Sequence, residues 1–207
     1  MTDQLAALWP VFGHALALTV ALTLATLVLG VPFALAVGAA LDAGSSIARA
    51  YVDVAKKLPL VVKLFALFFI LRVDAYVCAV VALVLHQVGF AADILRGGLT
   101  ALPGEIDEAA RTTGLSGMHR FWRIRLPLAL RHVAPALVLQ SVEVVKNTSI
   151  VSLIGLVEVT GAAEAYQSET FQYGAGFAVG ALAYVALVLP LMLMGRSLEK
   201  RVNRGGF

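Results

Sequence analysis

The chain has 207 residues, of which 60% are hydrophobic and only 14% are charged. Soluble domains are about half apolar and a quarter charged, so this composition, with a mean hydropathy of +0.88, excludes a soluble protein and indicates an integral membrane protein. The length predicts a single domain over 1–207.

Apolar stretches along the chain predict an all-α fold with about five transmembrane helices. The first, 13–41, contains no Asp, Glu, Lys or Arg and is long enough to cross a hydrocarbon core of about 30 Å. The others are expected at 58–71, 75–92, 128–157 and 174–195, and the second of the five is the shortest. At the start of the last one, Gly176 and Gly180 have the spacing that allows helices to pack closely in lipid.

The positive charges predict the orientation of these helices. Thirteen of the sixteen lysines and arginines lie in the first connection, in the third connection up to Arg131, or in the C-terminal tail. Because basic loops stay in the cytoplasm, we expect the N-terminus outside and the C-terminus inside. This rule also accounts for the net charge of +3, which therefore does not indicate a nucleic-acid partner.

The connection 93–127, between the third and fourth spans, is long and polar. Its stretch "EAARTTGLSGMHRFWRIRLP", 108–127, holds four arginines and a histidine. Pro103 suits the first turn of a helix, Gly114 its left-handed end, and Ser116 can cap a second helix. We expect two short helices joined at a glycine on the membrane surface. A basic amphipathic segment that only anchors to anionic lipid is the alternative.

This stretch resembles the EAA loop of permease subunits of ATP-binding-cassette (ABC) importers. The matching positions are Glu108, Ala109, Ala110, Gly114, Ile124, Leu126 and Pro127. Three further segments, "DILRGGLTALPGEIDEAARTTGLS", "KNTSIVSLIGLVEV" and "KKLPLVVKLF", resemble the polar amino-acid uptake branch of that family. In such importers the loop is a coupling helix that docks on a separate ATPase, which is the role that the resemblance implies for these residues.

The resemblance also implies the partners. We expect two cytoplasmic ABC ATPase subunits, a second permease subunit that is identical or paralogous, a periplasmic or membrane-tethered solute-binding protein, and an amino acid as substrate. The chain contains no G-x-x-x-x-G-K-[ST] phosphate loop. We therefore expect it not to be an enzyme and to hold no cofactor, with ATP and Mg bound by the ATPase, in the bacterial cytoplasmic membrane.

Polar side chains within the spans are rare, and each is a candidate for the substrate path because a charge there costs roughly 2.5–3.5 kcal/mol on insertion scales. The candidates are Lys63, His86, Gln140, Glu143, Lys146, Asn147, Thr148 and Ser149. The polar run 147–149 also suits a break in the fourth span. No metal site is predicted.

Each candidate also has a structural interpretation. Glu143 and Lys146 are three residues apart and can neutralise each other, Lys63 can snorkel to an interface, and His86 can be a satisfied interior residue. If Lys63 and Lys146 both reach the cavity, an acidic amino acid is favoured; if Glu143 dominates, a basic or zwitterionic one is.

Two other classes of function remain. A secondary transporter would use Glu143, Lys146 or His86 to relay protons, but such proteins commonly contain internal repeats, and no convincing repeat relates the halves of this chain. A membrane-anchored scaffold would use the basic loop to bind lipid or nucleic acid.

Overall fold

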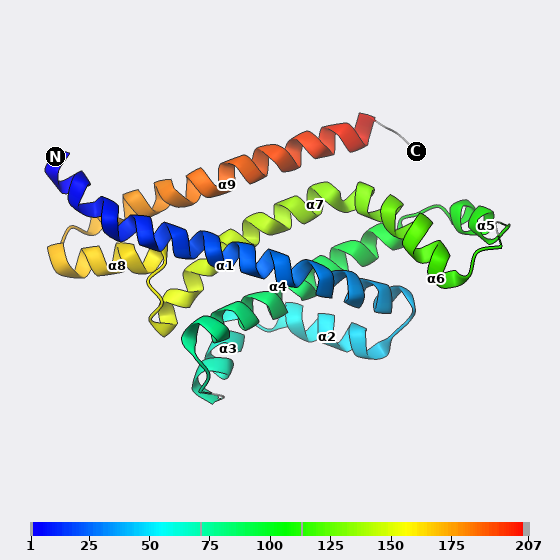
Figure 1. Cartoon of the computed structure of the whole chain (residues 1–207), viewed down its shortest axis with the longest axis horizontal. Helices are drawn as coiled ribbons and strands as arrows, with labels where there is room; N and C mark the ends of the chain where they lie inside the picture. Colours follow the sequence, from blue (N-terminus) through cyan, green and yellow to red (C-terminus); the bar gives the residue numbers. More distant parts are fainter. Residues whose placement is uncertain (1, 71, 113, 205–207) are drawn as a thin grey trace.

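The structure is a computed structural model that describes residues 2–70, 72–112 and 114–204, and no strand occurs among them. The predicted all-α class is confirmed (Figure 1). The helices are α1 (Thr2–Asp42), α2 (Ser46–Lys57), α3 (Leu60–Phe65), α4 (Ala75–Thr100), α5 (Gly104–Thr112), α6 (Gly117–Arg120), α7 (Leu126–Asn147), α8 (Val159–Thr170) and α9 (Tyr173–Arg204). Two π-helical turns, η1 (Ala66–Ile70) and η2 (Phe121–Arg125), and a 3-10 helix, η3 (Thr148–Ile154), continue α3, α6 and α7.

Among the described residues, four helical segments are long and apolar enough to cross a membrane. They are Phe12–Asp42, Ala75–Thr100, Gly117–Ile154 and Gly174–Val202. Each contains one of the predicted spans. The span expected at 128–157 is helical only as far as Ile154. The helices run further than predicted at the end that carries α5 and α6, because polar helical turns continue past the apolar residues that marked each span.

The second predicted span, 58–71, differs from a single crossing helix. Its apolar part is helical over Leu60–Ile70, which at 1.5 Å per residue covers about 16 Å, roughly half of a hydrocarbon core. Amphipathic α2 precedes it, broken from it at Leu58 and Pro59, and the two together run back along α4 (Figure 1). Among the described residues this region therefore holds a short apolar helical stretch preceded by amphipathic α2, and no membrane-length helix.

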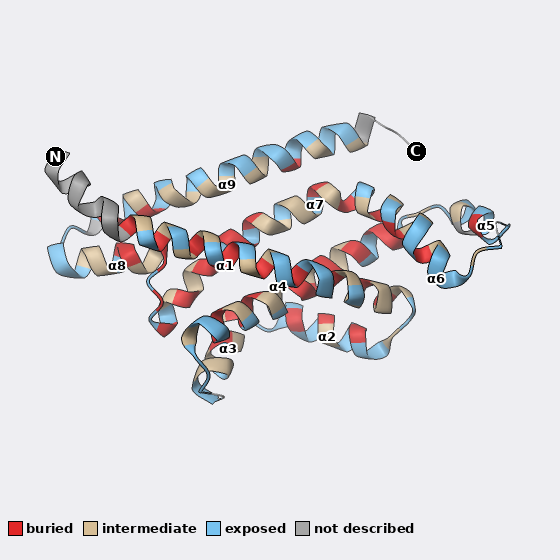
Figure 2. Ribbon diagram, in the orientation of Figure 1, coloured by how far each residue is buried: buried red, intermediate tan, exposed pale blue. Residues whose placement is uncertain are grey.

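Helix α4 lies at the centre of the molecule, in contact with α1, α2, α3 and α7. Small residues allow these approaches: a Cβ atom on Gly89 would lie 2.5 Å from that of Ala55 in α2, and one on Gly98 would lie 2.4 Å from a methyl group of Val133 in α7. Buried residues accordingly gather on α4 and on the helix surfaces that face it (Figure 2).

Helix α9 packs on one side only, against α7 and α8. The close packing predicted for Gly176 and Gly180 is confirmed, since both are buried against α8, with Ala163 as a shared neighbour. In the most apolar stretch of α9 only 6% of the residues are buried, whereas 50% are buried in the corresponding stretch of α4. Most of the apolar surface of α9 is thus left for lipid or a partner subunit.

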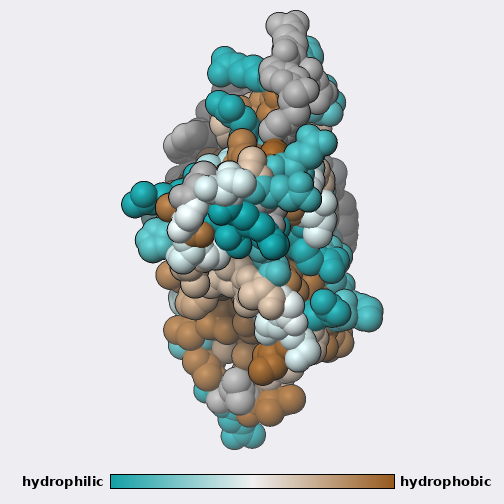
Figure 3. Space-filling view, turned by 90° about the vertical axis from the view of Figure 1, so that its right-hand side faces the viewer, coloured by the Kyte–Doolittle hydropathy of each residue, from teal (hydrophilic) through white to brown (hydrophobic). Residues whose placement is uncertain are grey.

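The two ends of the molecule differ. Helix α8 and the start of α1 lie at one end, and α5, α6 and the last turns of α9 lie at the other (Figure 1). Seen from the α5 end, hydrophilic side chains gather over the middle of the face and hydrophobic ones lie below them (Figure 3).

Candidate functional site

The polar loop folds as two short helices, as predicted. Gly114, with φ of +70°, lies between α5 and α6 in the left-handed conformation that only glycine adopts readily. The hydroxyl of Ser116 accepts a hydrogen bond from the backbone N–H of His119 at 3.5 Å and caps α6. Pro103 directly precedes α5, which begins at Gly104.

The residues that match the EAA pattern fall into two groups. On α5, Glu108 and Ala109 are exposed at the end of the molecule, whereas Ala110 is buried. Near the start of α7, Leu126 is buried in a cluster with Leu95 and Phe121, while Ile124 is half-buried and Pro127 is exposed. Glu108 and Ala109 are thus presented outward, and the end of the motif is fixed in the helix bundle.

An ion pair that the sequence did not indicate joins the loop to α1. The Nη1 and Nη2 atoms of Arg125 donate to the Oδ2 and Oδ1 atoms of Asp42 at 2.6 and 2.9 Å. Both side chains are mostly buried, and bidentate pairs of this kind are strong and directional. Its only signal in the sequence is an aspartate at the end of an apolar span, on the face where the arginines are concentrated.

Lys63 and His86 lie together on the side of α4 that faces α2 and α3. The Lys63 Nζ atom donates to the carbonyl oxygen of Ala55 at 2.7 Å and lies 2.8 Å from His86 Nδ1. An ammonium group at that distance requires His86 Nδ1 to be the unprotonated ring nitrogen. The ring of His86 also packs against that of Phe90, with centroids 4.8 Å apart. Lys63 is therefore engaged at the end of α2.

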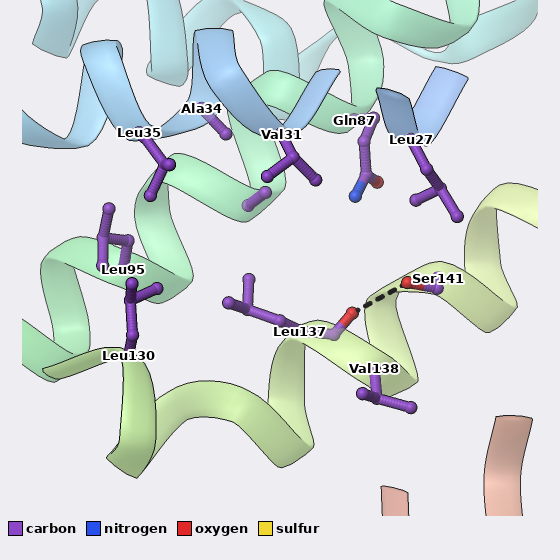
Figure 4. Close-up of a pocket in the computed structure, with 11 residues that line it drawn as sticks. Leu27, Val31, Ala34, Leu35, Gln87, Leu95, Leu130, Leu137, Val138 and Ser141 are labelled. Carbon is purple, nitrogen blue, oxygen red and sulfur yellow. Dashed lines mark hydrogen bonds between the residues drawn. The ribbon is translucent and has the colours of Figure 1, made fainter. Parts of the chain in front are cut away.

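Gln140 lies elsewhere, at the contact of α4 and α7. Its side-chain amide donates to Gln87 Oε1 at 3.1 Å. Gln87 faces a cavity of about 240 Å³ between α1, α4 and α7. Figure 4 shows its amide among leucine and valine side chains, with Ser141 on the opposite wall donating to the Leu137 carbonyl. The cavity is mostly apolar, with few polar groups.

Glu143 and Lys146 form an ion pair on α7, as their spacing predicted. The Lys146 Nζ atom lies 2.5 Å from Glu143 Oε1, and the two side chains are 52% and 51% exposed. No helix in the described part of the chain covers this pair, although it lies inside an apolar membrane-length segment. Ionised groups are rarely exposed to hydrocarbon, so this pair is unusual for the surface of a membrane-length helix.

The polar run 147–149 does mark a change in the helix. The α-helix ends at Asn147, which is half-buried. The 3-10 helix η3 follows over Thr148–Ile154, and Gly155 in the left-handed conformation ends it. The hydroxyls of Thr148 and Ser149 donate to the carbonyl oxygens of Val145 and Lys146 at 2.7 and 2.8 Å. These two hydroxyls therefore supply hydrogen bonds to backbone carbonyl groups where the helix type changes.

Beyond the C-terminal end of the same segment, Glu158 is fully buried. Its Oε1 atom accepts from the N–H groups of Thr160 and Gly161 at 2.9 and 3.0 Å, which caps α8. Its Oε2 atom accepts from the hydroxyl of Tyr184 on α9 at 2.6 Å. This carboxylate joins α8 to α9.

The predicted substrate-path residues thus form three separate groups. They are Lys63 with His86, Gln140 with Gln87, and Glu143 with Lys146 next to the polar run 147–149. Gln140 of the second group and the Glu143–Lys146 pair of the third are on α7, with Gln140 and Glu143 about one helical turn apart.

Comparison with known proteins places these features in a family. Residues 26–204 match the family model described as binding-protein-dependent transport system inner membrane component. The octopine transport system permease protein OccM of Rhizobium meliloti is 34% identical over 155 residues, 68% of this chain and 63% of that protein, so the matched part spans under two thirds of that relative. The arginine transport system permease protein ArtQ of Bacillus subtilis is 30% identical, covering 76% and 74% of the two chains.

Solved structures agree with this result. A crystal structure of an amino acid ABC transporter with histidines has a TM-score of 0.84 and 26% identity, covering 96% of this chain and 97% of that one. An inward-facing structure of the MetNI methionine ABC transporter has a TM-score of 0.75 at 20% identity, covering 98% and 99%, a likeness of fold alone.

Proposed function

Since the chain belongs to the family of binding-protein-dependent transport system inner membrane components, we propose that it is the transmembrane subunit of an ABC importer that carries a polar amino acid across the cytoplasmic membrane. The relatives are named for transport of octopine and arginine, and a similar structure is that of an amino acid ABC transporter. These matches favour an importer permease over an ion-coupled secondary transporter. ATP hydrolysis then belongs to separate subunits.

The observation that carries this proposal is the position of α5. Its exposed residues Glu108 and Ala109 lie at the end of the molecule, and the segment that follows is tied to α1 by the pair of Arg125 with Asp42. A surface helix anchored in this way can transmit force from a partner to the membrane helices. It is the proposed docking element for one of two ATPase subunits.

A second permease subunit, identical or paralogous, is proposed to cover the exposed face of α7. The exposed pair of Glu143 and Lys146 supports this, because a partner would shield it from lipid and leave it beside the substrate path. The two charges are opposite, as are those of a free amino acid. Glu143 can meet the ammonium group and Lys146 the carboxylate.

This arrangement argues for a zwitterionic substrate over an acidic one. Selection of an acidic amino acid by two lysines would need Lys63, whose ammonium group is engaged with Ala55 and His86 at the end of α2. A solute-binding protein outside the membrane would deliver the amino acid to the end that carries α8.

Co-purification tests the coupling role. The tagged chain is expressed from its native gene neighbourhood, isolated in mild detergent, and compared with Glu108→Arg and Glu105→Arg, two charge reversals at exposed positions of α5. We expect an ATPase with the native chain and with Glu105→Arg, and its loss from Glu108→Arg. If no ATPase accompanies any of them and the chain alone moves solute down an ion gradient, the proposal is wrong.

A further inference from the structure

One side of α7 carries a row of mostly polar residues. They are His132, Ala136, Gln140, Glu143 and Asn147, spaced by four, four, three and four residues, which places them on one side of an α-helix. Of these, His132, Ala136 and Glu143 are exposed, and Gln140 and Asn147 are half-buried. We call this row the α7 stripe. At 1.5 Å per residue it is about 22 Å long, which is most of the roughly 30 Å of a hydrocarbon core.

The long helices α1 and α9 expose a different surface. Between 15 and 41 on α1 and between 174 and 195 on α9, every exposed residue is nonpolar. The large ones include Leu24 and Phe33 on α1 and Phe177 and Leu182 on α9. Such surfaces suit lipid, whereas ionisable groups in membrane segments normally face the protein interior or a water-filled cavity. The α7 stripe, with a histidine, a carboxylate and two amides, has the composition of a surface in contact with water.

The neighbours of α7 leave the middle of the stripe open. Helix α7 lies between α4 and α9 (Figure 1). At one edge Gln140 contacts Gln87 of α4, and at the other Leu139 lies against Gly195 of α9. Between these two contacts, Glu143 is 51% exposed.

A second copy of this chain that faced the stripe would not pack on it directly. Two copies in one membrane have the same orientation, so their two-fold axis is parallel to the membrane normal and each residue faces its counterpart at the same depth. Glu143 would then face the partner's Glu143, and Lys146 the partner's Lys146, and like charges repel each other. Two such stripes are therefore separated, with room for water between them.

We propose that the α7 stripe is one wall of a water-filled path along which the solute crosses the membrane, from the Asn147 end to the His132 end. This rests on the proposed function, in which a second permease subunit covers this face of α7. It adds His132 and Ala136 to the path. The methyl group of Ala136 lies one helical turn from His132 and one from Gln140, so it leaves a notch between two longer side chains. The size of this notch limits the amino-acid side chain that can pass.

Cysteine accessibility in the assembled complex tests the wall. With Cys78 replaced by alanine, His132→Cys, Ala136→Cys and Glu143→Cys are treated in broken membranes with a small cationic methanethiosulfonate. We expect them to react at least about tenfold faster than Leu182→Cys, an exposed position on α9, because the reagent attacks the thiolate and thiolates form in water. Reaction as slow as at Leu182→Cys, in a complex that still holds the ATPase, would overturn the path and leave the importer assignment intact. Fast reaction in a chain that holds no ATPase would keep the path and reject the importer.

The size of the side chain at 136 tests the notch. Uptake of a mixture of radiolabelled amino acids is measured in proteoliposomes that contain the whole complex. Ala136→Ser should keep uptake, and Ala136→Leu should lose most of it while still binding the ATPase. The matched control is Ala178→Leu, the same change at an exposed position of α9, which should transport like the native chain. Equal uptake by Ala136→Leu and Ala136→Ser would show that Ala136 does not limit the path.

Discussion

Lys63 compensates for a hydrogen bond that Pro59 cannot make. In a continuous helix the N–H of residue 59 would donate to the carbonyl oxygen of Ala55, but proline has no N–H. The ammonium group of Lys63 donates to that oxygen, and a positive charge at the end of α2 is favourable to its dipole. The role of Lys63 is thus the stabilisation of the α2–α3 break.

Replacing Lys63 by methionine should therefore destabilise the chain. The substitution keeps the length of the side chain and removes the donor, so we expect a loss of about 1–3 kcal/mol. Thermal unfolding of the purified protein in detergent measures it. The control is Lys57→Met, a change of an exposed lysine in the last turn of α2, next to the same break, and it should unfold like the native chain.

Glu143→Gln should change transport without disturbing assembly. Its carboxylate is exposed and pairs only locally with Lys146, so the fold does not depend on it, whereas an amino-acid ammonium group would lose its partner. Uptake in proteoliposomes should show a raised Km or altered selectivity. Glu164→Gln, an exposed change on α8, should leave uptake as it is. Unaltered uptake of all substrates by Glu143→Gln would remove this residue from the path.

The sequence indicated some of these residue pairs and missed others for a simple reason. Glu143 and Lys146 are three residues apart, so helix periodicity alone predicts their contact, and that prediction is confirmed. Lys63 and His86 are 23 residues apart, and Arg125 and Asp42 are 83 apart. Their contacts depend on how separate helices pack, which local patterns do not determine.

At the level of elements, α4 is the helix that α1, α2, α3 and α7 pack against, and its small residues set the distances. Gly89→Ala should be destabilising, because its Cβ would lie 2.5 Å from that of Ala55 and the α2–α4 contact would have to open. Such overpacking costs typically 1–3 kcal/mol. A Cβ atom at Gly97 in the same helix would meet open space. The unfolding midpoint of Gly89→Ala should therefore be lower than that of Gly97→Ala.

The long helices were predictable from hydropathy, and α2 was not. Four of the five predicted spans coincide with membrane-length helices, since a largely apolar stretch of about 18 or more residues leaves few alternatives. Helix α2 buries only Ala48, Val52 and Ala55. Its remaining positions are mostly polar, including Arg49 and Lys57, so its composition is that of a loop. Its helical state depends on packing against α4, and it forms a separate element before the apolar helix within the predicted 58–71.

At the scale of the whole molecule, the proposed orientation can be tested by labelling. With Cys78 replaced by alanine, Ser168→Cys on α8 should react with a membrane-impermeant maleimide in spheroplasts, and Met118→Cys at the opposite end should react only after permeabilisation. Both positions are exposed. The reverse pattern would invert the topology that the positive charges predict.

One continuous helical segment connects the two ends of the molecule. It runs without interruption from Gly117, beside the proposed docking helix, to Ile154, next to the turn that leads into α8. The segment is not a straight rod: it contains Pro135 and changes helix type at η2 and η3, and α6 lies at an angle to α7 (Figure 1). If α5 is the docking helix, a movement imposed there would reach α8 through every part of this segment, and we expect bending at Pro135 and at the left-handed Gly155.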